Sequence, residues 1–124
     1  MSTLRIEPIA RHSDARGELL KLLPTAVPGE VYLVKAVPGT SRGHHVHQHC
    51  GEWFALLSGQ GLLRTICPRT QAIQDVELQG VRVYVPAGWA HAIFNTGDED
   101  LWVLAMADKP YDPSDSHPHP VPAP

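Results

Sequence analysis

The chain has 124 residues, a length that fits one domain and leaves no room for a second. Hydrophobic residues make up 43% and charged residues 19%, and the formal net charge is -3. This balance is typical of a globular domain and gives no electrostatic attraction to nucleic acid or anionic membranes. No apolar run approaches the roughly 20 residues of a membrane span, and Met1–Arg5 lacks the apolar stretch of a secretory signal. We expect a cytoplasmic protein without nucleic-acid or membrane partners.

Short apolar runs, separated by Gly, Pro, Asp and Asn, recur along the chain without helical periodicity. Their composition and spacing predict an all-β sandwich or barrel. The expected strands are Glu18–Leu23, Val31–Ala36, Trp53–Leu57, Gly61–Ile66, Arg82–Val85, Ala92–Asn95 and Leu101–Met106.

Turn residues lie between these runs. Asp14–Gly17 and Val37–Thr40 carry the residue types of tight turns. Ser58–Gly61 separates two strand-like runs and predicts a β-hairpin, and Asn95–Asp98 predicts a second one before the last strand.

The last residues of the chain differ in character from the rest. From Asp112 onward most residues are Pro, Ser, Asp or His, a composition that cannot bury a core. We expect a barrel over residues 1–112 and a flexible tail over residues 113–124. The two histidines of this tail are given no functional weight. The two cysteines, Cys50 and Cys67, are expected to be free thiols.

The eight histidines of the chain include a cluster of four between His44 and His49. Such clustering raises the hypothesis of a metal site. His45 and His47 are two residues apart, so on a strand both side chains leave the same face. His44 has the opposite parity, and His49 follows beyond the strand end. Both are expected to lie outside the ligand set.

Two further candidate ligands lie downstream. Glu52 stands where the chain enters the predicted strand Trp53–Leu57, and His91 follows a Pro-Ala-Gly turn that lets the chain bend sharply. Three imidazoles and one carboxylate suit a divalent transition metal, namely Zn, Fe(II), Mn, Ni or Cu. The alternative is a metal-free barrel in which the same histidines are hydrogen-bonded structural residues.

Two segments carry these residues at spacings that resemble the two motifs of the cupins. The first contains Gly39, His45, His47, Glu52 and Gly59, and the second contains Gly80, Pro86, Gly88, His91 and Asn95. The resemblance extends from about Gly17 to Asp112. It implies a single-domain double-stranded β-helix (cupin/jelly-roll) barrel that holds one divalent metal ion with His45, His47, Glu52 and His91.

A finer resemblance lies in an ordered series of short segments. The series is Asp14–Gly17, Arg42–His47, Glu52–Phe54, Val85–His91 and Tyr111–Pro113. It is similar to the small cupin domains of capsular-polysaccharide reductase/epimerases and of sugar-nucleotide ketoisomerases in deoxysugar pathways. Cys50 stands where the capsular domains usually have a lysine. The resemblance implies a metal-dependent isomerase or epimerase that moves a proton next to a ketone on a keto sugar nucleotide or similar keto metabolite.

Other candidate site residues follow from parity and from the same resemblance. Phe54 and Leu56 share the parity of Glu52 and are expected to wall the pocket. Asn95 shares the parity of His91, and is either an inward polar group or a turn residue. The remaining candidates are Arg42, which is either a substrate contact or a surface residue; Trp89 and Trp102, which either line the pocket or pack; and Tyr84 and His49 as acid–base groups.

Two other functions stay open at this stage. One is a metal-dependent cyclase, dehydratase or dioxygenase of a natural-product pathway, because the same ligand set supports Lewis-acid and oxygen chemistry. The other is a non-catalytic cupin that binds a metabolite or metal. The resemblance further implies a homodimer formed through the segment near Leu4–Ile9.

Overall fold

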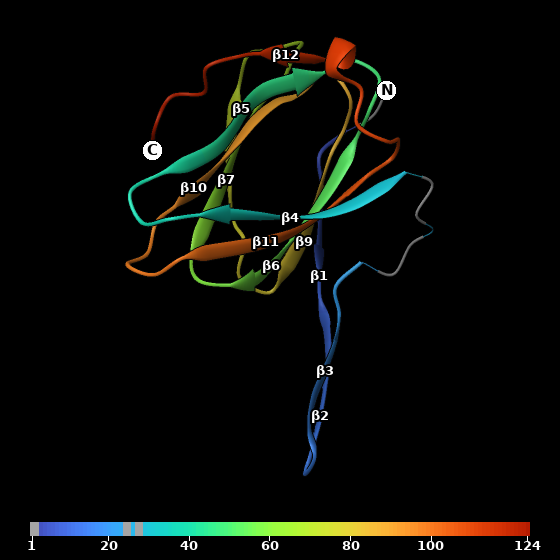
Figure 1. Ribbon diagram of the computed structural model, residues 1–124, viewed down its shortest axis with the longest axis vertical. Helices are drawn as coiled ribbons and strands as arrows, with labels where there is room; N and C mark the ends of the chain where they lie inside the picture. Colours follow the sequence, from blue (N-terminus) through green and yellow to red (C-terminus); the bar gives the residue numbers. More distant parts are fainter. Residues whose placement is uncertain (1–2, 24–25, 27–28) are drawn as a thin grey trace.

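The computed structural model describes residues 3–23, 26 and 29–124. In this part of the chain two five-stranded β-sheets face each other as a double-stranded β-helix barrel (Figure 1). The sheet here called the β6 sheet has the strand order β1 (Arg5–Pro8), β9 (Val81–Val85), β6 (Glu52–Ser58), β11 (Leu101–Ala107) and β4 (Glu30–Ala36). The β5 sheet has the order β12 (Ser116–Pro118), β5 (Ser41–His47), β10 (Ala90–Asn95), β7 (Gly61–Ile66) and β8 (Ile73–Glu77). The all-β cupin fold predicted from the sequence is confirmed.

The main hydrophobic core lies between the inner faces of the two sheets. Val83 and Val103 of the β6 sheet pack in one buried cluster with Leu63 and Ile93 of the β5 sheet. All the paired strands run antiparallel, so alternate residues point into this core. At the end of the barrel where β5 ends and β6 begins, the inward-facing residues lie beside a cavity instead of in the core.

A second buried cluster covers the outer face of the β5 sheet. Val46, Ala92 and Phe94 contribute to it from β5 and β10, and Val121 contributes from the C-terminal segment. Because successive strand residues alternate between faces, Val46 points outward while its neighbours His45 and His47 point inward. The outer cluster thus packs on the face of β5 opposite the two histidines.

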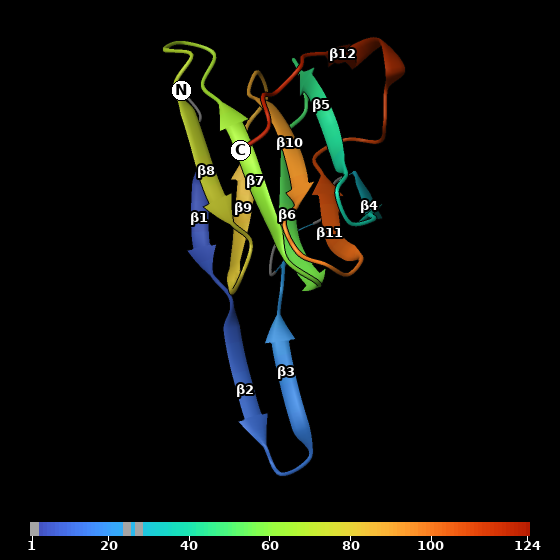
Figure 2. The ribbon, with the colours of Figure 1, turned by 90° about the vertical axis from the view of Figure 1, so that its left-hand side faces the viewer.

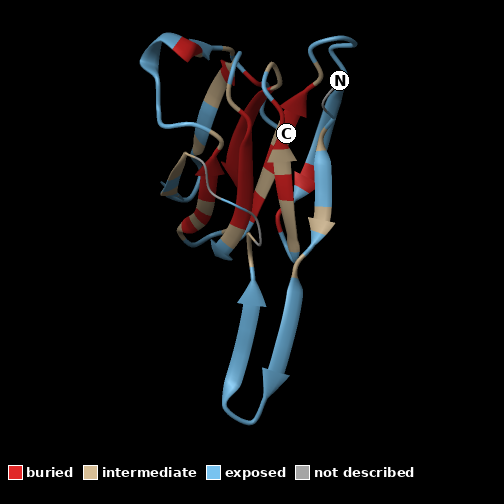
Figure 3. Cartoon of the chain, turned by 90° about the vertical axis from the view of Figure 1, so that its right-hand side faces the viewer, coloured by how far each residue is buried: buried red, intermediate tan, exposed pale blue. Residues whose placement is uncertain are grey.

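A hairpin of β2 (Ala10–Asp14) and β3 (Gly17–Lys21) projects from the barrel as an arm (Figure 2). All ten of its strand residues are exposed, in contrast to the buried strands of the barrel (Figure 3). The predicted turn Asp14–Gly17 closes this arm, and the backbone N–H of Arg16 donates to Asp14 Oδ1 over 2.8 Å.

The seven predicted strands correspond to β3, β4, β6, β7, β9, β10 and β11. Four strands, β1, β2, β8 and β12, were not expected. They are edge or arm strands whose polar residues face solvent, so they lack the apolar alternation that signals a half-buried strand. The motif strand β5 was expected only through the parity of His45 and His47.

The two hairpin predictions are wrong. β6 and β7, on either side of Ser58–Gly61, belong to different sheets, and so do β10 and β11 around Asn95–Asp98. The glycine-containing turns exist, but each carries the chain from one sheet across to the other. Turn chemistry specifies a sharp reversal without specifying whether the flanking strands pair with each other.

The expectation of a loose C-terminal tail is also wrong, because the segment packs on the barrel. Pro113–Asp115 forms a 3₁₀ turn (η1), and β12 then pairs with β5 at the edge of the β5 sheet. Val121 is only 4% exposed. An open sheet edge provides backbone partners to a segment that has few apolar side chains of its own.

Cys50 and Cys67 are both free thiols, as predicted. Across the described residues, no helix has the length and apolar character that a bilayer crossing requires.

Candidate active site

Two of the three histidines of the site, His45 and His91, face each other across neighbouring strands. In the antiparallel register of β5 and β10, His45 lies opposite His91, and their ring centroids are 4.8 Å apart. The register shifts directly after this pair, because β5 carries an extra residue there. Gly43 and His44 accommodate the bulge with φ of 109° and 57°.

His44 is turned away from the other histidines by this bulge. Its Nε2 lies 2.8 Å from Ser41 Oγ, and its ring packs edge-on against Phe94 in the outer cluster. Its Nδ1 accepts a hydrogen bond from the backbone of Val121. The prediction that His44 lies outside the ligand set agrees with this placement.

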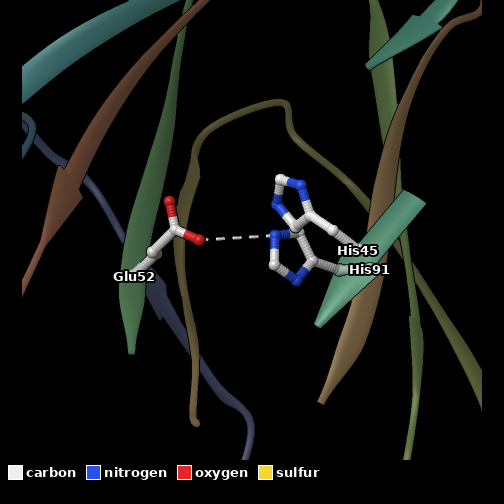
Figure 4. A group of neighbouring side chains, drawn as sticks. All are labelled: His45, Glu52 and His91. Atoms are coloured by element: carbon white, nitrogen blue, oxygen red, sulfur yellow. Dashed lines mark ion pairs between the residues drawn. The ribbon is translucent and has the colours of Figure 1, made fainter. Parts of the chain in front are cut away.

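Glu52 reaches the histidines from the opposite sheet as the first residue of β6 (Figure 4). Its Oε1 lies 3.5 Å from His91 Nε2 and 3.2 Å from His47 Nε2. Donor atoms of His45, Glu52 and His91 all lie within 4.8 Å of one another. The structure thus brings together the four residues that the two sequence motifs singled out.

The carboxylate of Glu52 is buried and incompletely partnered. Its Oε2 accepts a hydrogen bond from the hydroxyl of Tyr32 on β4. Its Oε1, in contrast, has no hydrogen-bond partner among the residues that the structure describes. A buried carboxylate oxygen without a partner is costly, so such an atom needs an explanation.

The pKa values of His45 and Glu52 favour the forms of these two residues that can bind a metal. Burial, reinforced by the neighbouring His91 and His47, lowers the pKa of His45 to about 4. Burial by itself would raise the pKa of Glu52, but the imidazoles of His47 and His91 and the hydroxyl of Tyr32 lower it below its ordinary value. His45 is therefore neutral and Glu52 ionised at neutral pH, as metal ligands must be.

His47 and Tyr32 respond to the same carboxylate. Contact with Glu52 raises the pKa of His47 above its ordinary value. Burial and the charge of Glu52 raise the pKa of Tyr32, so its hydroxyl keeps its proton and acts as a donor. The charge of Glu52 therefore influences the protonation of both neighbours, His47 and Tyr32.

A cavity of about 570 Å³ opens from these residues toward solvent. Its walls come from the start of β4, from the loop that follows β5, and from the C-terminal end of β11 through η1. The lining residues are Glu30, Tyr32, His45, His47, His49, Cys50, Glu52, Ala107, Lys109, Pro110, Tyr111, Asp112, Asp115 and Ser116.

Several lining residues were not among the sequence candidates. Tyr32 carried a usable signal, because it shares the parity of Val34 and Ala36 on a predicted strand and so points inward. Asp115 and Ser116 carried none, because residues 113–124 were expected to form a flexible tail. Tyr111 and Asp112 belonged to the ordered series of short segments but were not singled out as site residues. His49, a predicted acid–base group, does line the cavity and is exposed there.

Phe54 and Leu56 both point inward, as their parity predicts. Phe54 is buried with its ring centroid 5.5 Å from that of His91, so it packs against this histidine. Leu56 packs further along the strand against the main core. Neither residue lines the cavity, so the expectation that they wall the pocket is wrong.

Tyr84 does not reach the cavity. Its neighbours Val83 and Val85 point into the main core, so Tyr84 leaves the other face of the β6 sheet. There it stacks near Trp53 and donates a 2.6 Å hydrogen bond to Asp108. Its position does not support the predicted acid–base role in this cavity.

The other candidates also lie outside the cavity lining. Trp89 borders a separate hollow near Leu4 and Cys67. Trp102 lies beneath the ammonium of Lys35, and Arg42 is exposed on β5. Asn95 takes the second of its two expected roles and holds the turn. Its side-chain amide donates to the carbonyls of Ala36 and Glu99, and its Oδ1 accepts from the backbone N–H of Gly97.

The fold and the grouped histidines and glutamate define the class of protein: this chain is a small cupin. The sequence profile of the polysaccharide biosynthesis C-terminal domain family matches residues 12–118. The chain therefore belongs to this family.

Individual proteins similar to this chain are enzymes of sugar metabolism by name. The UDP-2-acetamido-2,6-beta-L-arabino-hexul-4-ose reductase of Pseudomonas aeruginosa is 31% identical over 107 residues, covering 84% of this chain and 29% of the reductase. The glucose-6-phosphate isomerase of Pyrococcus horikoshii is 30% identical over 102 residues, covering 82% of this chain and 50% of the isomerase. The chain thus spans half or less of the length of these relatives.

Among solved structures, the dTDP sugar isomerase of Desulfovibrio desulfuricans superposes with a TM-score of 0.86 at 18% identity. The superposition covers 94% of this chain and 83% of the isomerase. This similarity supports the cupin fold.

Proposed function

We propose that this protein is a metal-dependent isomerase or epimerase that moves a proton at a carbon next to a ketone. The observation that carries the proposal is the buried Glu52 Oε1, which lacks a hydrogen-bond partner among the described residues. It faces the imidazoles of His47 and His91, and His45 lies in the same group of donors. A divalent cation at this point would supply the missing partner. The solvent-connected cavity beside it provides room for a substrate.

The residues present fit such an ion. His45, His47, Glu52 and His91 offer three imidazole nitrogens and a carboxylate oxygen, a donor set suited to Zn, Fe(II), Mn or Ni. An ion held there would supply Lewis acidity toward a substrate carbonyl and so make the proton on the neighbouring carbon more acidic. Phe54 packs against the ring of His91 from the core side, outside the cavity lining, and supports that ligand.

The remaining lining residues supply the proton chemistry in this proposal. Tyr32 holds Glu52 through its hydroxyl and keeps its own proton, because its pKa is raised by burial and by Glu52. His49 lines the cavity outside the proposed ligand set and is exposed, so its imidazole can exchange protons with water. We propose His49 as the group that transfers the proton at the carbon.

The substrate that we propose is a keto sugar nucleotide or a similar keto metabolite. Support comes from the family and from relatives whose names specify a UDP-linked hexulose reductase and a sugar isomerase. Proton transfer beside a carbonyl is the step that an epimerase and a keto-isomerase have in common.

Deuterium incorporation tests the reaction directly. Protein purified without chelator is first analysed for metal, and is then incubated in deuterated water with a panel of 4-keto and 3-keto sugar nucleotides and phosphosugars. We expect about one equivalent of metal per chain and a gain of deuterium at the carbon next to the ketone. The His45→Ala/His91→Ala variant should lose both, whereas the His12→Ala/His117→Ala variant, which removes two exposed histidines, should keep both.

Other outcomes separate the competing functions. Oxygen consumption by Fe(II)-loaded protein would indicate dioxygenase chemistry instead. Tight binding of a sugar that is recovered unchanged and undeuterated would indicate a binding protein. Either result would replace the isomerase proposal.

We also propose that two copies of the chain form a homodimer. The segment Leu4–Ile9, expected to make the contact, contains β1 at one end of the β6 sheet and leads directly into the β2–β3 arm. An isolated two-stranded hairpin is marginal in water without a surface to pack on. Leu19 and Leu20 on the arm are 55% and 40% exposed, which supports an intermolecular contact for this region.

A further inference from the structure

We infer that Asp115 is a positioning residue of the candidate active site, and that the C-terminal segment is a working part of that site. Asp115 lies in η1, far from the ligands in sequence, but it holds the loop that connects His47 to Glu52. The inference rests on the proposed function, because it assigns Asp115 a role in presenting two of the proposed metal ligands.

The carboxylate of Asp115 is buried and bonds to backbone. It is 8% exposed. Its Oδ1 accepts hydrogen bonds from the N–H groups of Gln48 at 3.0 Å and His49 at 3.1 Å, and its Oδ2 lies 3.2 Å from the same His49 nitrogen. Hydrogen bonds to an ionised acceptor are stronger than those between neutral groups.

The amides of Gln48 and His49 lie in the loop between two proposed metal ligands. β5 ends at His47, so Gln48 and His49 are the first residues beyond the strand, and their direction sets the path toward Glu52 on the opposite sheet. The loop therefore has one proposed ligand on each side, with the proposed acid–base group His49 between them. A shift of these amides moves the imidazole of His47 relative to Glu52.

Asp115 is itself fixed from both directions. Asp112 caps η1 by accepting from the backbone N–H of Ser114 at 2.9 Å. On the other side, β12 pairs with β5 so that Ser116 lies opposite His47 and Pro118 opposite His45. The carboxylate is thus held in register with the strand that carries two proposed ligands.

Further contacts hold the rest of the segment. His119 donates its backbone N–H to the carbonyl of His44 over 2.8 Å, and Val121 donates to His44 Nδ1 over 3.1 Å. Val121 is buried in the outer cluster with Val46 and Phe94. Removing this hydrophobic side chain would loosen the segment without touching the bonds that Asp115 makes to the loop.

Because a change at Val121 and a change at Asp115 affect different contacts of the segment, comparing the two variants tests the inference. Full-length wild type, Asp115→Asn and Val121→Ala are titrated with Co(II) alone, and the absorption bands of the bound ion and its dissociation constant are recorded. An outer group that orients a ligand typically contributes about 10–100-fold to metal affinity, so Asp115→Asn should weaken Co(II) binding by about tenfold or more and change the bands. Val121→Ala should lower the melting temperature but leave the bands and the affinity within about twofold of wild type.

Amide hydrogen exchange supplies a readout that needs no metal. In Asp115→Asn the amides of Gln48 and His49 should exchange faster than in wild type, whereas in Val121→Ala they should not. Should Asp115→Asn fail to fold, Asp115→Glu keeps the charge but displaces it by one methylene, and is interpreted in the same way.

The outcomes distinguish the two proposals. A wild-type protein that binds no Co(II) overturns the proposed function and this inference with it. A wild-type protein that binds Co(II), with Asp115→Asn binding it equally well, overturns only the role of Asp115. Equal losses of affinity in Asp115→Asn and Val121→Ala would mean that the segment acts through general stability alone, which also overturns it.

Discussion

The mouth of the barrel, where His45, His47, Glu52 and His91 lie, and the β2–β3 arm differ in how many neighbouring strands surround their residues. Glu52 and His91 are each 3% exposed and come from opposite sheets, and neighbours on several strands surround them. The arm has only its own two strands, and all ten strand residues are exposed. The same chain therefore contains a region whose geometry is fixed from many directions and one that depends on a single hairpin.

This contrast relates to what each region can do. A site that converts a substrate needs its groups held to within fractions of an ångström, and packed strands provide that precision. The arm gains stability only by packing on something else. The mouth of the barrel is suited to chemistry, and the arm to contact with another molecule.

The largest effect is expected from Glu52→Gln at the mouth of the barrel. The amide keeps the shape of the side chain but removes the charge that a cation would neutralise. Metal affinity should fall by more than the roughly 10–100-fold that an outer group contributes, as measured by titration calorimetry. Glu77→Gln, on the exposed edge strand β8, should bind metal like wild type. Unchanged affinity in Glu52→Gln would remove Glu52 from the ligand set.

The core that supports the site should be the next most sensitive feature. Leu63 is fully buried between the two sheets. Leu63→Ala should cost about 3 kcal/mol of unfolding free energy, through lost burial and the cavity it leaves. Exposed Leu57 provides the control, since Leu57→Ala should stay within about 0.5 kcal/mol of wild type in urea unfolding. Similar losses in both variants would contradict the assigned core.

Metal removal should have a comparable but smaller effect on the whole barrel. A ligand present at about 100 times its dissociation constant stabilises the folded state by about 2.7 kcal/mol. Chelation should therefore lower the melting temperature by several degrees, and added Zn(II) should restore it in a concentration-dependent way. In the His45→Ala/His91→Ala variant, chelator and Zn(II) should leave the melting temperature unchanged. A wild-type protein that is indifferent to both would speak against a bound ion.

The sequence predicted the mouth of the barrel better than its surroundings. Alternation on a strand was enough to place His45 and His47 on one face, and motif spacing was enough to connect them with Glu52 and His91. The direction in which each of these side chains points depends on its own strand and the adjoining turn, both of which are local features of the sequence. Tyr32 could have been added by the same parity argument, because it lies on a predicted strand.

What the sequence could not provide was long-range pairing. Nothing local indicates that β6 and β7 enter different sheets, because a turn with glycine serves a hairpin and a crossover equally well. Asp115 could not be found either, since its partners are two backbone amides more than 60 positions away. A proline-rich segment predicts disorder when considered alone, and becomes ordered only where an open strand edge such as that of β5 receives it.

The smallest effect on folding, and the most direct test of the arm, is expected from Leu19→Ser combined with Leu20→Ser. Both side chains are exposed in the single chain, so the unfolding free energy of the barrel should change by no more than about 0.5 kcal/mol. If the arm packs on a second copy, the same changes place hydroxyls in an apolar contact and should convert a dimer into a monomer in light scattering. Leu57→Ser, an equally exposed substitution on the barrel, should leave the dimer intact. A wild-type protein that is already monomeric at micromolar concentration would refute the homodimer, and the arm would then have to pack on a different partner.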